Sequence, residues 1–291
     1  MDYARGIKRA ALVGLVIPLL ISMMAWGAPG DNGVSKVAES HNTVKAIAER
    51  DVLFQTSTIG ALMFGVYDGD VSFAELKQHG GFGLGTVNGL DGEMLALDGQ
   101  FYQIKTDGIA YKIDDAQKTP FANVTFFDVD LSLQLEAGMT YDQLEKAIDD
   151  MLPTKNTFYA IKIEGVFNYV KTRSVPAQQK PYIPLLDVIP NQVFFEFDNI
   201  KGTLVGFRCP SYVNGINVPG YHLHFITDDK TRGGHVIALE TGEVQLSIDQ
   251  TRGFNMALLN SNAFDNADLS VEGLDDVEKP KSSLLFYGDY K

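Results

Sequence analysis

Cysteine is almost absent from this chain of 291 residues, since Cys209 is the only one. A single cysteine excludes an intramolecular disulfide and any structural metal site built from several thiolates. Stability must therefore come from packing. A catalytic cysteine needs a histidine partner, and the sequence places none beside Cys209, so we interpret it as a small buried apolar residue.

Positive charge is also scarce, and this scarcity limits the partners of the chain. The sequence has 24 lysines and arginines against 37 aspartates and glutamates, which gives a net charge of −13. An acidic surface repels phosphate backbones, so the charge argues against nucleic acid as a partner. It suits a soluble exported protein, and a hydrophobic fraction of 45% is enough for a real core.

Long hydrophobic runs are missing except near the N-terminus. There, three basic residues precede an apolar run, Ala10–Trp26, and small residues follow it. This order predicts a secretory signal peptide over residues 1–28, a flexible tether over 29–50, and export to the periplasm or the medium. The run is near the minimum length of a membrane span, so an uncleaved N-terminal anchor is the alternative. We expect no stable span in the mature chain.

The remaining residues predict an α+β protein in two parts. Residues 51–178 are expected to form an N-terminal α/β domain with a mixed sheet. Residues 179–291 are expected to form an all-β C-terminal domain, barrel- or sandwich-like, that carries the metal site described below and the tail. A proline-rich stretch, Val175–Pro190, connects the two predicted domains.

Local patterns predict the elements of these domains. Capping-box spacing predicts helices at Ser72–His79 and Thr140–Leu152. Apolar runs predict one buried strand over Val52–Val66 and another over Asn123–Glu136. Beyond Pro190 we expect strands and no helix.

Glycines are grouped between the first helix and the second. Aspartate–glycine pairs punctuate short alternating segments there, which predicts an antiparallel meander. Gly81, Gly83 and Gly85 lead into these hairpins and not from a strand into a helix. This context argues against a phosphate-binding loop.

Histidine is scarce too, yet three of the five lie in one stretch, Tyr221–Val236, which reads YHLHFITDDKTRGGHV. Residues two apart on a strand face the same side, so His222 and His224 are expected to project together. The segment DDKTRGG reads as a turn. If His235 then lies opposite His224, and Ile237 opposite His222, all three imidazoles share one face. Three imidazoles with an open fourth position are typical of catalytic zinc sites, although imidazole also suits copper, nickel and iron.

The residues around the histidines resemble the metal-binding core of the alpha-acetolactate decarboxylase family, in the stretches GTLVGFRCPSYVNGINV and GYHLHFITDDKTRGGHV. Two upstream stretches are similar to the N-terminal and central blocks of that family: FQTSTIGALMFGVYDGDVSFAELKQHGGFGLGTVNGLDGEMLALDGQFYQI and KTRSVPAQQKPYIP. The resemblance covers about Val52 to Glu278. It implies an N-terminal α/β part with a mixed sheet, a C-terminal β part that carries the metal, and a homodimer.

The same resemblance implies a set of site residues. They are zinc ligands His222, His224 and His235, catalytic residues Glu93 in NGLDGEM, Arg173 in KTRSV and Glu278 in DDVEKP, and a substrate-lining Thr86 in GLGTVN. Arg173 is also implied to bind the substrate. Glu272 is the nearest alternative to Glu278.

The implied reaction is the decarboxylation of a small molecule, (2S)-2-acetolactate, to (R)-acetoin and CO₂. Zinc would chelate the hydroxyl and carbonyl oxygens of the substrate and stabilise the enediolate left after CO₂ departs. Arg173 offers a planar fork suited to the carboxylate. Glu93 or Glu278 would then protonate the enediolate on one face, because the product is chiral.

Two other classes of function are compatible with the residues alone. A His-x-His pair on a β scaffold also suits a His₃-metal hydrolase or a cupin-like oxygenase. A cupin usually adds a glutamate soon after the pair, whereas here the next glutamate is Glu240, past the third histidine. The predicted export signal would also suit a non-catalytic metal- or small-molecule-binding protein, which would need neither Arg173 nor Glu93 beside the metal.

Overall fold

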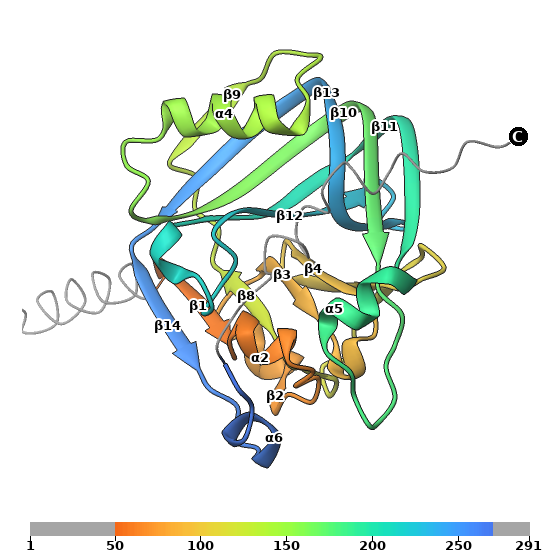
Figure 1. Cartoon of the computed structure of the whole chain (residues 1–291). Helices are drawn as coiled ribbons and strands as arrows, with labels where there is room; N and C mark the ends of the chain where they lie inside the picture. The colour runs from red at the N-terminus through yellow and green to blue at the C-terminus, as the bar shows by residue number, and fades with distance from the viewer. Residues whose placement is uncertain (1–49, 270–291) are drawn as a thin grey trace, which may run out of the picture. The chain divides into compact units, whose positions relative to one another are not determined.

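The computed structural model describes residues 50–269 (Figure 1). The predicted signal peptide, the predicted tether up to residue 49, and both Glu272 and Glu278 lie outside the described residues. Within residues 50–269, no helix is both long enough and apolar enough to cross a membrane.

The first sheet brings the two ends of the described chain side by side. Its seven strands follow the order β14–β1–β8–β3–β4–β5–β6, and β14 pairs in parallel with β1 while the other neighbours are antiparallel. The run from β3 to β6 confirms the predicted meander, with Asp98 and Gly99 in left-handed conformations at the β4–β5 turn. The strands are β1 (Val52–Thr56), β3 (Phe82–Thr86), β4 (Glu93–Leu97), β5 (Gln100–Ile104), β6 (Ala110–Lys112), β8 (Ala122–Thr125) and β14 (Gly253–Ala257).

The second sheet contains the longest strands. Its order is β10–β11–β12–β13–β9, and β10 also pairs with β13, so both edges of β10 are hydrogen-bonded. Both β9 and β10 precede residue 178, yet they pair with strands that follow it. The strands are β9 (Leu131–Gln134), β10 (Phe158–Ser174), β11 (Val193–Cys209), β12 (Gly220–Thr227) and β13 (Gly233–Thr251). A separate small sheet pairs β2 (Val71–Ser72) with β7 (Lys118–Thr119).

Both predicted helices are present. Ser72 caps α3 (Phe73–Leu76) by accepting a hydrogen bond from the backbone N–H of Glu75, and both halves of the capping box are formed at the start of α4 (Tyr141–Met151). Helix α4 covers the second sheet (Figure 1), where Leu144 and Ile148 enter its core. The predicted connection after β10 contains only α5 (Leu185–Val188) and the start of a 3₁₀ turn, η2 (Ile189–Asn191).

The predicted strand Val52–Val66 is wrong beyond Thr56. Strand β1 ends where Ser57 adopts a left-handed φ of 61°, and helix α2 (Ile59–Met63) follows. Thr58 caps this helix, because its hydroxyl oxygen accepts a hydrogen bond from the backbone N–H of Ala61 at 3.1 Å. An apolar run of this length is compatible with a buried strand or a buried helix, and here it is divided between the two.

Two further expectations are corrected. The predicted strand Asn123–Glu136 is two strands, since β8 lies in the first sheet and β9 in the second. Short helical segments also occur beyond Pro190: η3 (Ser211–Val213) and α6 (Asn262–Asp265), the latter capped by Ser261. A further 3₁₀ turn, η1 (Asn88–Leu90), lies between β3 and β4.

The two large sheets pack against each other through an apolar layer. Leu84 and Leu95 of the first sheet belong to the same buried cluster as Val205 and Phe207 of the second, and all four are at most 1% exposed. Burying a side chain of this size contributes roughly 2 kcal/mol. This layer fixes β3 and β4 against β11 and β12 and so sets the position of the polar residues at its end.

An acidic cluster lies where the loop between β8 and β9 meets β13. Burial raises the pKa of Asp249 to about 7. The carboxylates of Asp130, Asp51 and Asp128 act in the same direction. The backbone N–H of Asp128 donates to Oδ2 of Asp249 at 3.1 Å, and this hydrogen bond opposes the shift. The folded protein therefore favours the protonated form of Asp249.

Replacing Asp249 with asparagine should stabilise the protein at alkaline pH. The folded pKa lies above the ordinary value of about 3.9, so the wild-type protein should lose stability between about pH 4 and about pH 7, whereas the variant should not. Above pH 7 the difference should be at most about 4 kcal/mol. Urea unfolding of both proteins from pH 4 to pH 8 measures it. The same pH dependence in both proteins would contradict this role of Asp249.

Candidate metal centre

The three clustered histidines converge as strand parity predicts. His222 and His224 lie two apart on β12, and the pairing of β12 with β13 places His235 directly opposite His224. Their ring centroids are 5.0 to 5.3 Å apart, and all three side chains are buried. One ligand nitrogen from each lies within 4.8 Å of the others. The pairing ends at this point, so His222 does not face Ile237, which sits at a register shift of β13 against β10.

The hydrogen bonds of the cluster leave nitrogen lone pairs available. Nδ1 of His224 lies 2.8 Å from the carbonyl oxygen of Met94. A carbonyl can only accept, so this nitrogen carries the proton and Nε2 carries the lone pair. Nδ1 of His235 lies 3.2 Å from Nε2 of His222. Within residues 50–269, Nδ1 of His222 and Nε2 of His224 have no hydrogen-bond partner.

Two of the imidazoles, those of His222 and His224, are held in their neutral form. Burial lowers the pKa of His222 to about 3, and the positive charge of Arg173 acts in the same direction. Burial also lowers the pKa of His224 well below its ordinary value. Neutral imidazole is the form that binds metals, and buried nitrogen atoms without hydrogen-bond partners need an explanation. These residues therefore fit a divalent cation, with three nitrogen ligands and room for further ligands.

Glu93 and Arg173 lie beside the histidines and come from different sheets. Glu93 is the first residue of β4, opposite Thr86 on β3, whereas Arg173 lies near the end of β10, opposite His235. Nη1 of Arg173 is 3.5 Å from Oε1 of Glu93. Oε2 of the same carboxylate is 3.5 Å from Nε2 of His224. Both side chains are less than a tenth exposed, so their charges act in a poorly solvated site.

A cavity opens between the histidines and α2. Its polar side is formed by His222, His235, Glu93, Arg173 and Thr86. The hydroxyl of Thr86 donates to the carbonyl oxygen of Gly92 at 2.6 Å, so towards the cavity it can act only as an acceptor. The opposite side is an apolar wall: Ile59, Leu62, Leu90, Phe121, Val175 and Leu185.

Three of the other residues implied by the resemblance, Glu93, Arg173 and Thr86, thus meet the histidines, while Glu278 lies outside the described residues. The sequence-based interpretation missed the apolar wall, because it assigned Ile59 and Leu62 to a strand. The one local signal for that wall was Thr58, whose position before an apolar run suits a helix cap. Glu93 does not join the group of possible ligands, since among residues 50–269 the group within ligand distance consists of the three histidines.

Comparison with known proteins identifies relatives of the chain. A sequence model of the family described as alpha-acetolactate decarboxylase matches residues 53–271. A curated alpha-acetolactate decarboxylase from Methanosarcina mazei is 51% identical over 258 residues, which cover 88% of this chain and 90% of the relative. Another, from Bacillus subtilis, is 43% identical and covers 79% of this chain and 91% of the relative.

Solved structures agree with these sequence relatives. The crystal structure of alpha-acetolactate decarboxylase from Bacillus subtilis strain 168 is similar with a TM-score of 0.76 at 42% identity, over 78% of this chain and 99% of that one. A Staphylococcus aureus protein, described as similar to alpha-acetolactate decarboxylase, has a TM-score of 0.73 at 32% identity, over 78% of this chain and 97% of that one. The sheets and the histidine cluster therefore occur in a fold shared with these proteins.

Replacing His224 with alanine should remove most of the metal that the protein binds. His224 contributes one of three converging nitrogens, and its ring is fixed by Met94. Metal content after equilibrium dialysis, measured by atomic emission, gives the result. His79→Ala is the matched control, because His79 stacks on Phe54 outside the cluster and its removal should leave the metal content unchanged. Full metal content in the His224 variant would refute the site.

Proposed function

The chain is an enzyme of the alpha-acetolactate decarboxylase family, and on that basis we propose that it converts (2S)-2-acetolactate to (R)-acetoin and CO₂ with zinc held by His222, His224 and His235. The observation that carries the proposal is the juxtaposition of three buried imidazoles with Glu93 and Arg173 around one cavity. Zinc bound there would supply a Lewis acid for the negative charge that develops on substrate oxygens as CO₂ departs.

The polar and apolar sides of the cavity suit a small ketoacid. Hydroxyl and carbonyl oxygens would face the histidines, and the two methyl groups would pack on the wall that includes Leu62, Phe121 and Leu185. These side chains are at most 6% exposed, so the wall excludes water from that side of the substrate. The cavity would thereby bind the substrate in one orientation.

Arg173 is the residue we assign to the carboxylate of the substrate. A guanidinium keeps its charge when buried and presents a planar fork that matches a carboxylate. Glu93 lies 3.5 Å from Nη1 of Arg173 and limits the positions that the guanidinium can adopt. Arg173 would hold the scissile bond in a fixed orientation while CO₂ leaves.

A carboxyl group must then deliver a proton to one face of the product carbon. Glu93 is well placed, since its Oε1 lies 3.5 Å from the guanidinium of Arg173 and its Oε2 lies 3.5 Å from Nε2 of His224. Glu278 is the second candidate, and the path of the chain supports it. Phe264 and Ala267 pack against a cluster that contains Ala61 of α2, the helix that lines the cavity.

The length of chain that follows is sufficient for this role. Glu278 lies nine positions beyond Leu269, the last residue described. At about 3.3 Å per residue this length of chain can span roughly 30 Å, which is several times the length of α2. We therefore keep Glu93 and Glu278 as the pair of carboxyl groups from which the proton comes.

Export and dimer formation are further parts of the proposal. The basic residues and the apolar run within residues 1–28 support a secretory signal. A homodimer is proposed from the resemblance to the family.

Purified protein incubated with racemic 2-acetolactate should form acetoin faster than the spontaneous reaction does. Removal of the metal by a chelator should abolish the excess rate, and added zinc should restore it. Chiral chromatography of the product should give (R)-acetoin from no more than the S half of the substrate. Acetoin formation at the spontaneous rate by zinc-loaded protein would rule out the proposed reaction.

Arg173→Lys should keep its zinc but lose roughly 100-fold or more in kcat, because an ammonium cannot reproduce two parallel hydrogen bonds to a carboxylate. Zinc content and steady-state kinetics are measured on the same preparation. Arg208→Lys is the control, since Arg208 is equally buried but pairs with Asp149 away from the cavity. Wild-type kinetics in the Arg173 variant would remove this residue from the mechanism.

A further inference from the structure

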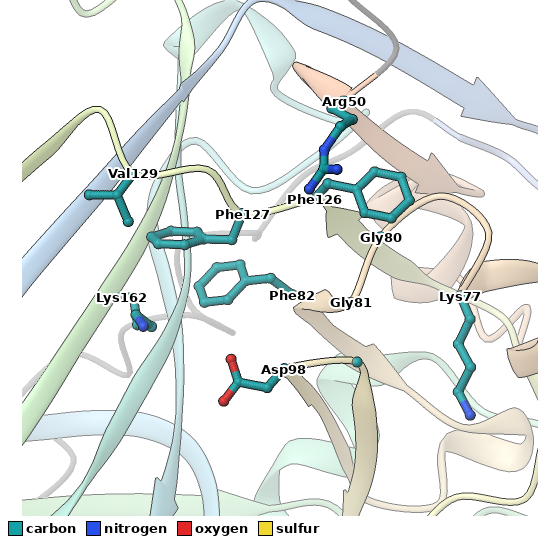
Figure 2. A pocket seen from close by; sticks show the side chains of 11 residues that line it. Arg50, Lys77, Gly80, Gly81, Phe82, Asp98, Phe126, Phe127, Val129 and Lys162 are labelled. Carbon is teal, nitrogen blue, oxygen red and sulfur yellow. The ribbon is translucent and has the colours of Figure 1, made fainter. Parts of the chain in front are cut away.

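A second cavity lies at the ends of β3 and β4 that are remote from the histidines. It is lined by Arg50, Lys77, Gly80, Gly81, Phe82, Asp98, Gly99, Phe126, Phe127, Val129 and Lys162 (Figure 2). Its volume of about 490 Å³ lies within the usual range for pockets that bind small molecules. None of its lining residues lines the cavity at the histidines.

The geometry of β3 and β4 separates the two cavities. Phe82 begins β3 and lines the second cavity, whereas Thr86 ends the strand and lines the first. Likewise Glu93 begins β4, and Asp98 follows its last residue. At about 3.3 Å per residue, the ends of such a strand are roughly 13 Å apart. A ligand in the second cavity would therefore not touch the metal ligands.

Aromatic rings form the apolar part of this cavity. Figure 2 shows the rings of Phe82 and Phe127 side by side, and their centroids are 4.4 Å apart. The ring of Phe82 is buried while that of Phe127 is partly exposed, so Phe127 offers the accessible surface. Such a surface favours a ligand with a flat apolar body.

Cations flank these rings. The guanidinium of Arg50 lies 5.4 Å from the ring centre of Phe126, and the ammonium of Lys162 lies 5.5 Å from that of Phe127. Among residues 50–269, no carboxylate pairs with Arg50. Lys162 pairs with Glu164 on its solvent side at 2.8 Å, which leaves two of its three N–H donors for another acceptor.

Two other charged residues contribute less to an anion site. Lys77 pairs with Asp115, and Figure 2 shows its ammonium away from the rings, so its aliphatic stem is the part that lines the cavity. Asp98 is the one acid of the lining, and its carboxylate faces Phe82. Arg50 and Lys162 are thus the two cations beside the rings, against the one carboxylate of Asp98.

Glycine keeps one wall of the cavity bare. A side-chain carbon on Gly81 would lie 2.8 Å from the backbone of Gly99, and one on Gly80 would lie 2.2 Å from the carbonyl oxygen of Thr125. Close approach of the backbone therefore requires glycine at both positions.

We propose that this cavity binds a small organic anion with a flat apolar body, of which an aromatic carboxylate is the simplest example. The body would stack on Phe127, and the acidic group would lie near the ammonium of Lys162, with the guanidinium of Arg50 adding positive charge on the other side of the rings. Neither part alone would suffice, since exposed ion pairs contribute at most about 1 kcal/mol each. Recognition of both parts together distinguishes this site from a generally basic surface.

Calorimetric titration of the full chain with phenylacetate tests the proposal. Phenylacetate should bind, whereas acetate, which lacks the ring, and benzyl alcohol, which lacks the charge, should bind at least about fivefold more weakly. Phenylacetate at saturation should leave zinc-dependent acetoin formation free of competitive inhibition. Failure of the full chain to bind phenylacetate, or equal binding of all three probes, would overturn the proposal.

Variants place the binding in this cavity. Lys162→Met and Phe127→Leu should each weaken phenylacetate binding about fivefold, while Lys201→Met, at an exposed lysine outside the cavity, should not. Arg50→Gln, at an exposed position, gives the same test if Lys162→Met unfolds. Unchanged affinity in the cavity variants would assign the probe to another site.

Asp98→Asn decides the charge of the ligand. Asp98 has a left-handed φ of 51°, which asparagine tolerates well, so the fold should be kept. Loss of a carboxylate from the lining should tighten the binding of an anion. Weaker binding of phenylacetate in this variant would contradict an anion site, because it would mean that Asp98 helps to hold the ligand.

Discussion

The burial of three imidazoles where two sheets meet is the constraint on which the site depends. His224 belongs to the second sheet by its backbone, while its ring is fixed by the carbonyl oxygen of Met94 in the first. A buried nitrogen without a hydrogen bond costs about 1 to 3 kcal/mol, and two such nitrogens occur within this cluster. The apolar layer between the sheets offsets this cost and so holds the three histidines together.

The Glu93–Arg173 contact follows from the same arrangement. A carboxylate and a guanidinium buried separately would each be costly, whereas here each lies within 3.5 Å of the other's charged group. Each comes from a strand end, β4 for the acid and β10 for the base, so rigid backbone positions both. The cavity therefore contains a preorganised charge pair beside the histidines, with an apolar wall opposite.

Strand parity predicts the histidine face, because residues two apart on one strand and residues opposite across a turn follow from local spacing. The proximity of Glu93 and Arg173 does not follow from their spacing in the sequence. They are 80 residues apart, they meet only when different sheets pack, and resemblance to a known family was what pointed to them. The apolar wall was missed for a local reason, since the pattern around Ile59 fits a strand and a helix equally well.

Strand β10 connects the part of the chain that carries Glu93 to the part that carries the histidines. It is paired along both edges, by β11 on one side and β13 on the other, and Arg173 is its second-to-last residue. The histidines lie on strands that follow it, and Glu93 lies on a strand that precedes it. Neither half of the chain therefore contains a complete site, and β10 joins the two halves by its own hydrogen bonds. Separating the chain at residue 178 would therefore break the second sheet as well as divide the site.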